Sequence, residues 1–366
     1  MKKNRFLLLL LTAAALLLTA SCSKDDDEPQ QVNPPAAAGA RLQVMMVFAP
    51  GQLGDGGYAD GLLEYASGME FLEIMPDAED SIDVQFISLY SVNDTRQALK
   101  EWAAAVTHPF YKDVTYERRL LVLTEPYMTA WLADVKTNLR ETDEVLIMKA
   151  DEAYTQQMAN TYGLGNRAHG LNYDISAAIR LFCNNVGLMI HDPDLDPDFF
   201  GEKPEVVILR RFNAQQNYYC DGIEDVIRQQ LGNDVTLSVY SLADYVQADD
   251  LSEQTNVAYI QAAYTAAAQL DQYFQQKGYG FVVADMGICN FGMLNYLLGS
   301  PFCHYEVVML DSNPYTYNFK AICRQGSAVM TWIADWMRQP AAAMPRFRVA
   351  DSSCVLENFS EPIVKE

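Results

Sequence analysis

Residues 42–62 read LQVMMVFAPGQLGDGGYADGL. The run Leu42–Ala49 is almost entirely apolar, which is typical of a strand that is buried on both faces of a parallel sheet. Pro50 and Gly51 end the run and indicate a turn. Tyr58–Met69 then shows the apolar spacing of a helix. The stretch therefore predicts a strand, a glycine-rich turn and a helix, which together form one unit of an α/β fold.

The alternation of apolar strands and helices continues along the chain. Further strands are expected at Asp83–Tyr90, Leu120–Thr124, Glu144–Ala150, Glu205–Arg211, Val235–Leu242, Phe281–Asp285 and Glu306–Asp311, with a β-like tail at Arg346–Phe359. Further helices are expected at 94–106, 131–139, 176–186, 222–231, 256–276, 291–298 and 327–338. About four units lie on either side of residue 150, which predicts an α/β protein. One eight-stranded sheet is possible, but two doubly wound parallel-sheet lobes joined by a hinge agree better with usual domain sizes.

Two lobes imply a boundary between them and segments that cross it. We place the N-terminal lobe at residues 41–160 and the C-terminal lobe at residues 161–320. Residues 321–366 are expected to form a final helix and a tail that cross back to the lobes. The segments near 151–170 and 313–325 are expected to be the hinges.

The composition excludes several classes of function. The 366 residues include 48 acidic and 26 basic side chains, a formal net charge of −22. Such a chain repels phosphate backbones and anionic membrane surfaces, so no nucleic acid partner is expected. Half of the residues are apolar and 11% are aromatic. This is enough for a hydrophobic core and excludes intrinsic disorder for most of the chain.

The first forty residues read as an export and anchoring segment. Residues 1–21 combine a basic start with a Leu/Ala run that is too short to span a membrane, which is typical of a signal peptide. The small residues before Cys22 resemble a bacterial lipobox, in which the cysteine is lipidated, although Leu18 is one place further from the cysteine than usual. An ordinary signal peptide with a chance cysteine is the alternative. We expect an exported protein, lipid-anchored to the bacterial cell envelope on the periplasmic or the surface face of the outer membrane.

Residues 22–40 read as a tether between this anchor and the lobes. Lys24 is followed by the acidic run Asp25–Glu28, and prolines, alanines and a glycine come next. The acidic run resembles the export signal of surface lipoproteins in Bacteroides-like bacteria, and a solvated spacer is the alternative. The protein is expected to contact the membrane through its lipid anchor only.

Ligands of doubly wound sheets bind beyond the C-terminal ends of the strands. In this chain those ends are Pro50–Asp60, Ser91–Asp94, Thr124–Tyr127, Asp285–Asn290 and Asp311–Asn313, and in a two-lobed protein they face one another across a cleft. In the first loop, Asp55 could accept hydrogen bonds from ligand hydroxyls, and Tyr58 offers a ring for stacking. The loop has no phosphate-binding glycine motif. A plain turn in which Asp55 caps the next helix is the alternative.

Three of these stretches resemble the basic membrane protein family, the purine-nucleoside-binding lipoproteins of ABC transport. Asp55–Ala59 (DGGYA) is similar to the family's Asp-x-Ser-Phe-Asn, and Val308–Asn313 (VMLDSN) to its late strand that ends in Val-Asp-Ser-Asp. Asn256–Leu298, which contains Ala284-Asp285-Met286-Gly287, takes the place of the family's ADVIF segment. The resemblance covers about residues 41–340 and implies a type I periplasmic-binding-protein-like fold.

The resemblance also implies a function and a set of site residues. Tyr58 takes the place of the family's stacking Phe, Asp55 would position the ligand, and Asp311 matches the carboxylate that binds ribose hydroxyls. The expected ligand-binding set is completed by Asp285, Asn313 and Tyr245. The implied function is a solute-binding lipoprotein for uptake or sensing, with a nucleoside-like ligand, a transporter permease or surface partner, no cofactor and no metal. Gly57 and Ala59 replace the family's Ser and Asn, which weakens the case for a purine.

Two other functions stay open. One is a surface-exposed lipoprotein with a degenerate cleft that acts in protein or glycan interaction. The other is a cysteine hydrolase, because His169-Gly170 and Cys289 resemble the catalytic His and Cys of clostripain- and caspase-like peptidases. The residues before His169 do not read as the strand that those peptidases place there, and no G-x-S-x-G motif is present, so we expect no enzyme. The six cysteines after Cys22 show no metal-ligand spacing, and the sequence cannot choose among their pairings.

Overall fold

The computed structural model describes residues 42–50, 52–54, 57–69, 82–89, 91–105, 115–196, 198–213, 218–244, 246, 256–300, 302–312 and 320–359. All of them belong to one compact unit of the chain, residues 39–366. The signal peptide and the tether, with Cys22, lie outside the described residues, as do the predicted site residues Asp55, Tyr245 and Asn313.

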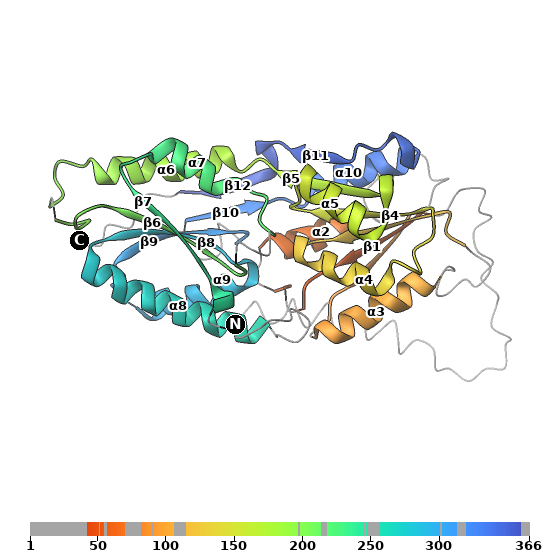
Figure 1. Cartoon of the computed structure of the whole chain (residues 1–366), viewed down its shortest axis with the longest axis horizontal. Helices are drawn as coiled ribbons and strands as arrows, with labels where there is room; N and C mark the ends of the chain where they lie inside the picture. Colours follow the sequence, from red (N-terminus) through yellow and green to blue (C-terminus); the bar gives the residue numbers. More distant parts are fainter. Residues whose placement is uncertain are drawn as a thin grey trace, which may run out of the picture. The chain divides into compact units, whose positions relative to one another are not determined.

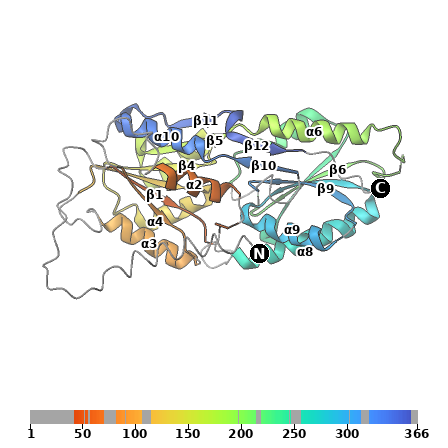
Figure 2. The same ribbon diagram turned by 180° about the vertical axis from the view of Figure 1, so that it is seen from behind.

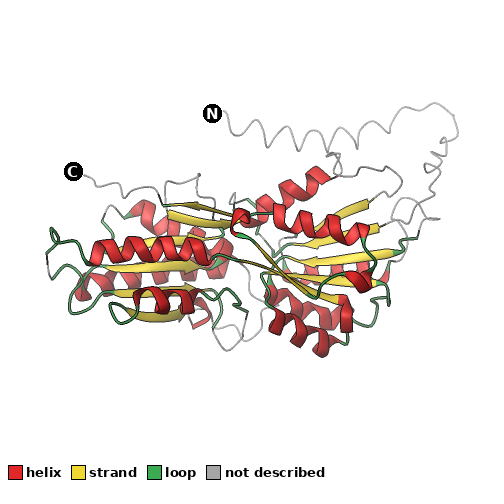
Figure 3. Ribbon diagram, turned by 90° about the horizontal axis from the view of Figure 1, so that it is seen from above, coloured by secondary structure: helices red, strands yellow, loops and turns green. Residues whose placement is uncertain are grey.

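The described strands form two six-stranded sheets (Figures 1 and 3). The first sheet has the order β11-β5-β4-β3-β1-β2 and is parallel throughout. Its strands are β1 (Leu42–Val47), β2 (Ile82–Ile87), β3 (Arg118–Leu123), β4 (Asp143–Met148), β5 (Ala168–Tyr173) and β11 (Phe347–Ala350). The two-lobed alternative of the sequence is therefore confirmed over a single eight-stranded sheet.

The second sheet has the order β12-β10-β9-β8-β6-β7. It is parallel except for β12, which runs antiparallel to β10. Its strands are β6 (Glu205–Arg210), β7 (Thr236–Ser241), β8 (Gly280–Asp285), β9 (Tyr305–Leu310), β10 (Lys320–Arg324) and β12 (Val355–Asn358). We call the part of the chain built on the first sheet the first lobe and the part built on the second sheet the second lobe.

Helices cover the sheets on both faces (Figures 1 and 2). One core cluster includes side chains of α3 (Val92–Ala104), α4 (Leu132–Val135), α5 (Glu152–Tyr162), α8 (Asn256–Lys277) and α9 (Asn290–Gly299). The other includes side chains of α2 (Tyr58–Met69), α6 (Ser176–Ile190), α7 (Ile223–Leu231) and α10 (Ser327–Arg338). Alternate residues of β1 enter the two clusters, Met45 and Val47 the first, Val44 and Met46 the second. This is why the strand is apolar on both faces, with Gln43 as its one polar residue, rather than alternating apolar and polar.

The chain passes between the two sheets three times. It leaves the first sheet after β5, and α6 then packs against α7 of the second lobe. It returns after β10, because α10 contacts α2 and β11 pairs with β5. It crosses again between β11 and β12, where β12 joins β10. The chain crosses after Tyr173, later than the boundary predicted at residue 160, and again after Arg324, close to the second predicted hinge.

The first predicted hinge, residues 151–170, is instead regular structure within the first lobe. Asp151 caps α5 by accepting a hydrogen bond from the Tyr154 amide, and Gly163 ends the helix with a φ of 66°. β5 follows, and all six of its residues are buried. The sequence AHGLNY did not predict this strand, because two of its buried residues are polar and bind partners that are distant in the sequence. His169 contacts Glu144 and the Pro345 carbonyl, at 3.0 Å each.

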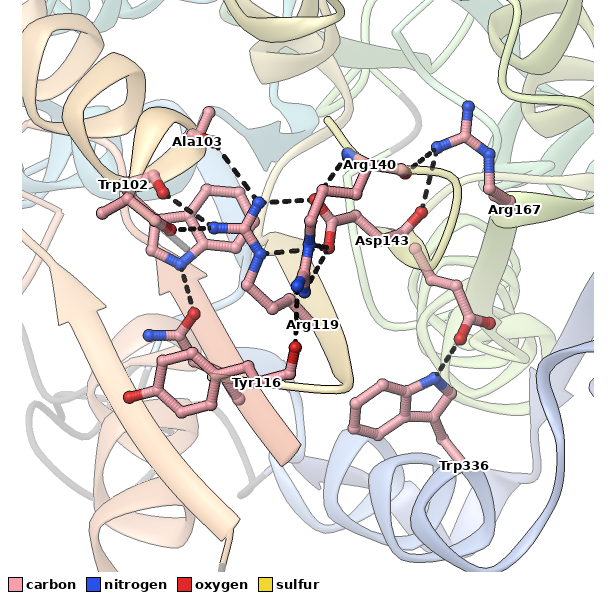
Figure 4. Close-up of polar contacts among 11 residues, drawn as sticks. Trp102, Ala103, Tyr116, Arg119, Arg140, Asp143, Arg167 and Trp336 are labelled. Carbon is pink, nitrogen blue, oxygen red and sulfur yellow. Dashed lines mark hydrogen bonds and ion pairs between the residues drawn. The ribbon is translucent and has the colours of Figure 1, made fainter. Parts of the chain in front are cut away.

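A buried ion pair joins the N-terminal ends of β3 and β4 (Figure 4). Arg119 is fully buried, its Nε donates to Asp143 Oδ1 at 3.0 Å, and its terminal nitrogens donate to the Trp102, Ala103 and Ala105 carbonyls at the end of α3. Burial acts to raise the pKa of Asp143, but hydrogen bonds from Arg119 and Arg140 hold it below its usual value. This network ties α3 to the sheet at the edge opposite to the strand ends where ligands of such folds bind.

Candidate functional site

A cavity of about 600 Å³, counting its open side, is lined by residues of both lobes. From the first lobe come Ala49, Gln52, Glu125, Pro126, Tyr127 and Lys149. From the second lobe come Arg211, Phe212, Tyr218, Tyr219, Cys220, Asp221, Asp285, Met286, Gly287, Ile288 and Arg324. Most of them follow the C-terminal ends of β1, β3, β4, β6, β8 and β10, which is where ligands of doubly wound sheets bind.

The local sequence explains why polar groups collect at this edge. The apolar run of each of these strands is buried between helices, and in β4, β8 and β10 a charged residue comes at or directly after its C-terminal end. Lys149 follows β4 directly, Asp285 is the last residue of β8, and Arg324 is the last residue of β10. Parallel strands bring these positions to one edge of each sheet.

Ion pairs connect the two lobes beside the cavity. Lys149 Nζ lies 2.6 Å from Glu125 Oε1 in the first lobe and 2.9 Å from Asp311 Oδ2 in the second. Arg324 Nη1 lies 2.7 Å from the same Asp311 oxygen. Burial acts to raise the pKa of Asp311, but the charges of Arg324 and Lys149 lower it to about 2. Asp311 is therefore ionised at all physiological pH values.

The backbone is strained on both sides of this connection. Lys149 and Asp311 each have a φ of 59°, a left-handed conformation that side-chain-bearing residues rarely adopt. They are the two non-glycine residues with positive φ in the described part of the chain. Such strain persists where surrounding contacts hold it and is concentrated at functional sites. Here the ion pair between the two strained residues supplies such a contact.

Two carboxyl groups of the second lobe, those of Asp221 and Asp285, also line the cavity. Asp221 lies in the loop before α7, and its Oδ1 accepts hydrogen bonds from Arg210 Nη2 and the Ile223 amide, at 3.1 Å each. Asp285 is 8% exposed. Burial and the neighbouring Asp221 raise the pKa of Asp285 to about 7, although Arg210 and Arg324 act to lower it. This carboxyl group therefore exchanges its proton near neutral pH.

Aromatic rings form a third part of the wall. Tyr127 and Phe212 lie with ring centroids 5.0 Å apart, and Tyr218 lies 5.5 Å from Phe212 and 6.3 Å from Tyr127. The Arg211 guanidinium lies over three rings, 4.5 Å from Tyr259, 5.0 Å from Phe212 and 5.4 Å from Tyr127. The cavity thus combines apolar ring surface with a few charged groups, the usual composition of a small-molecule site.

The structure places the predicted site residues in two different positions. Asp285 lines the cavity. Tyr58 and Asp311 lie together behind its wall. The Tyr58 amide donates to the Asp311 carbonyl at 3.0 Å, and Lys149 Nζ lies 4.7 Å above the Tyr58 ring. Tyr58 is only 2% exposed, so Lys149 separates its ring from the cavity.

The expectation that ligands bind beyond the C-terminal strand ends predicted some of the lining residues and missed others. The expected segments Pro50–Asp60, Thr124–Tyr127 and Asp285–Asn290 contribute to the lining, through Gln52 in the first case. Ser91–Asp94 and the described part of Asp311–Asn313 do not. Sequence reasoning missed Lys149, Arg211, Asp221, Tyr218 and Arg324. The position of Lys149 directly after an apolar strand was a usable signal. Arg324 was not foreseen because its strand, β10, was not foreseen.

Cys289 and His169, the residues named as hydrolase candidates, are poorly suited to that chemistry. Burial raises the pKa of the Cys289 thiol, and burial raises the pKa of Cys220, the cysteine in the cavity lining, to about 12. A nucleophilic cysteine needs the opposite shift. His169 is fully buried in β5, between Glu144 and the Pro345 carbonyl. The lining therefore offers binding groups rather than a nucleophile and its base.

Other site types are also missing from the described residues. The six cysteines from Cys183 to Cys354 are all described, and none is in a disulfide. Among the residues that the structure describes there is no cluster of three or more His, Cys, Asp or Glu side chains that could hold a metal ion. Within the same ranges, no helix is both long and apolar enough to cross a membrane.

Comparison with known proteins gives the fold. No protein-family model matches the chain, and no curated protein matches it in sequence. AraP, an arabinose binding protein from Geobacillus stearothermophilus, aligns over 87% of this chain and 96% of its own at 11% identity, with a TM-score of 0.53. An ABC transporter solute binding protein from Agrobacterium vitis, solved with bound allitol, aligns over 88% of this chain and 96% of its own at 12% identity, with a TM-score of 0.50.

A third solved structure extends the comparison to another class of protein. A protein described as a transcription regulator from Staphylococcus saprophyticus aligns over 87% of this chain and 97% of its own, at 13% identity and a TM-score of 0.52. Identities this low establish the fold and no more. The chain has the type I periplasmic-binding-protein fold, two α/β lobes with parallel-dominated sheets, as the sequence predicted.

Proposed function

We propose that this protein binds one small polar solute in the cavity between its two lobes and serves in solute uptake or sensing. The observation that carries the proposal is the cavity itself. Its wall is built from the C-terminal strand ends of both sheets and combines aromatic rings with buried charged groups. A solute that touches both walls favours the closed arrangement of the lobes and shifts the population toward it.

The similarity to AraP and to the allitol-bound protein supports the same function, because both are described as binding proteins for small solutes. The signal peptide and the lipid at Cys22 remain part of the proposal. They would hold the lobes at the cell envelope on the tether of residues 22–40, where a transporter permease or another envelope partner would receive the solute. A nucleoside also remains a candidate, although Tyr58 and Asp311, which suggested it, lie behind the cavity wall.

A thermal-shift screen tests this function. The panel contains nucleosides, nucleobases, neutral sugars and polyols, amino acids and primary amines. A solute at 100 times its dissociation constant stabilises the folded protein by about 2.7 kcal/mol, which is a readily measured shift of the melting temperature. We expect at least one class to stabilise the protein.

The matched variants locate the site. Tyr218→Ala removes a ring from the cavity wall and should abolish the shift. Tyr240→Ala removes an exposed ring from β7, outside the lining, and should leave it unchanged. The proposal is wrong if no class stabilises the protein, or if both variants keep the full shift. The protein would then be examined for the other predicted role, interaction with proteins or glycans through a degenerate cleft.

A further inference from the structure

One corner of the cavity contains a carboxylate oxygen that lacks a donor. The Oδ2 atom of Asp285 is buried and receives no hydrogen bond from an amide, guanidinium or hydroxyl group of the described residues. The whole residue is 8% exposed, and it lines the cavity. An unsatisfied buried acceptor costs free energy, so its presence in a cavity wall indicates that a ligand supplies the missing donor.

The charges around this atom leave an excess of negative charge. Arg210 Nη2 lies 3.1 Å from Asp221 Oδ1, but Arg210 Nε lies 3.9 Å from Asp285 Oδ2, beyond hydrogen-bond length. A third carboxylate, Glu224, lies 3.8 Å from Arg210 Nη1. The Arg210 guanidinium thus faces three carboxyl groups, and the charge of Arg324, which is paired with Asp311, also acts on Asp285. A further positive charge at this corner would take the place of the proton that Asp285 and Asp221 share.

The cations that line the cavity are Lys149, Arg211 and Arg324, and their ion pairs and ring contacts are with groups other than Asp285. Lys149 is paired with Glu125 and Asp311, and Arg324 with Asp311. Arg211 lies over the rings of Tyr127, Phe212 and Tyr259. Each keeps its own partners, and none forms an ion pair with Asp285 in the described structure at 4.0 Å or less.

We propose that the solute carries a protonated amino group and that this ammonium binds between Asp221 and Asp285. The inference rests on the proposed function, since it names the chemical class of solute for the same cavity. An ammonium has three donors and can serve both carboxylates at once with charge-assisted hydrogen bonds. A neutral hydroxyl has one donor and leaves the excess charge in place. The net charge of −22 also attracts cationic solutes to the protein.

Proton competition gives the proposal a measurable signature. Burial and the charge of Asp221 raise the pKa of Asp285 to about 7, with Arg210 and Arg324 acting against this shift. The carboxyl group of the empty site is therefore protonated in acid, and an ammonium has to displace that proton. Below pH 7 each pH unit should weaken binding of the amine about tenfold, and above pH 8 the affinity should be constant.

Calorimetric titration with matched pairs of probes tests the proposal. D-glucamine and D-sorbitol differ by one ammonium in place of one hydroxyl, and so do tyramine and 4-(2-hydroxyethyl)phenol. We expect the amine of at least one pair to bind at least tenfold more tightly than its alcohol at pH 8. We expect that amine to bind about 100-fold more weakly at pH 5 than at pH 8, since pH 5 lies two units below the pKa of about 7.

Variants separate this inference from the proposed function. Asp285→Asn should weaken the amine at least tenfold and remove the pH dependence, whereas Asp225→Asn, an exposed carboxylate on α7, should change neither. Alcohols that bind as tightly as their amines, in a manner that Tyr218→Ala abolishes, would overturn the inference and leave the proposed function standing. A pH-independent affinity for the amines would also overturn it. If no solute of any class binds, the proposed function fails and the inference fails with it.

Discussion

At the scale of single residues, two buried carboxyl groups at the same edge behave in opposite ways. Burial acts to raise the pKa of both. At Asp311 the charges of Arg324 and Lys149 outweigh the effect of burial, and the pKa is about 2. At Asp285 the neighbouring carboxyl group of Asp221 acts in the same direction as burial, and the pKa rises to about 7. Asp311 is therefore a permanent charge that joins the lobes, whereas Asp285 gains and loses its proton near neutral pH.

Asp311→Asn should destabilise the protein by about 3 kcal/mol at pH 7, because it leaves two buried cations without their shared carboxylate. The folded pKa of about 2 lies below the usual 3.8, so this stabilisation is complete above pH 4 and is lost as the pH falls toward 2. Urea denaturation of the wild type and the variant at pH 7 and pH 3 measures the loss of unfolding free energy. Asp225→Asn is the matched exposed control, with an expected change below about 0.5 kcal/mol. A loss of equal size at both pH values would contradict this account.

Asp285→Asn should have the opposite effect. The folded pKa of about 7 lies above the usual 3.8, so the wild type loses stability as the pH rises from about 4 to 7, and the amide variant does not. Without a bound solute, Asp285→Asn should therefore have a free energy of unfolding higher than that of the wild type at pH 8, by on the order of 2 kcal/mol. This difference should be smaller at pH 5. Melting temperatures of both proteins at the two pH values provide the comparison. If the stability gain of Asp285→Asn over the wild type were smaller at pH 8 than at pH 5, the raised pKa of Asp285 would be refuted.

At the scale of helices and strands, the sequence predicted what local patterns determine and missed what distant contacts determine. The strands around β1, β3 and β8 and the helix α10 were predicted because their apolar periodicity is intact. β5 was missed because His169 and Asn172 are buried polar residues whose partners are Glu144, the Pro345 carbonyl and the Cys220 carbonyl. The same distinction between local patterns and distant contacts applies to the residues of the candidate site. Strand ends were foreseen, but the pairing of Lys149 with Asp311 depends on how the two lobes meet.

The packing of α8 on α9 depends on one glycine. A Cβ atom at Gly292 would lie 1.9 Å from the Ile260 carbonyl oxygen, so the two helices would have to separate. Gly292→Ala should therefore cost on the order of 2 kcal/mol of unfolding free energy. Gly187 in α6 is the matched control. A Cβ there meets nothing within 4 Å, and Gly187→Ala should stabilise by about 0.5–1 kcal/mol. Chemical denaturation of both variants checks the sign, and a stable Gly292→Ala protein would show that this contact is not tight.

At the scale of the whole described unit, the proposed function depends on a cavity that both lobes line. The chain crosses between the sheets three times, and the cavity wall draws residues from both. The sequence predicted two lobes, and it placed the candidate site at the strand ends, where the cavity lies. It did not foresee the chemistry of the wall, because Asp221, Tyr218 and Arg211 lie in loops with no periodic pattern and become neighbours of Asp285 only in the folded unit.

The central claim is that a solute binds between the lobes at these strand ends, and hydrogen–deuterium exchange tests it most directly. The measurement compares the protein alone with the protein saturated by the solute that gives the largest thermal shift. The account predicts that slowed exchange is concentrated in residues 124–127, 211–212, 218–221 and 285–288, on both lobes at once. Slowed exchange in one lobe only, or confined to elements outside the lining such as α9, would contradict it.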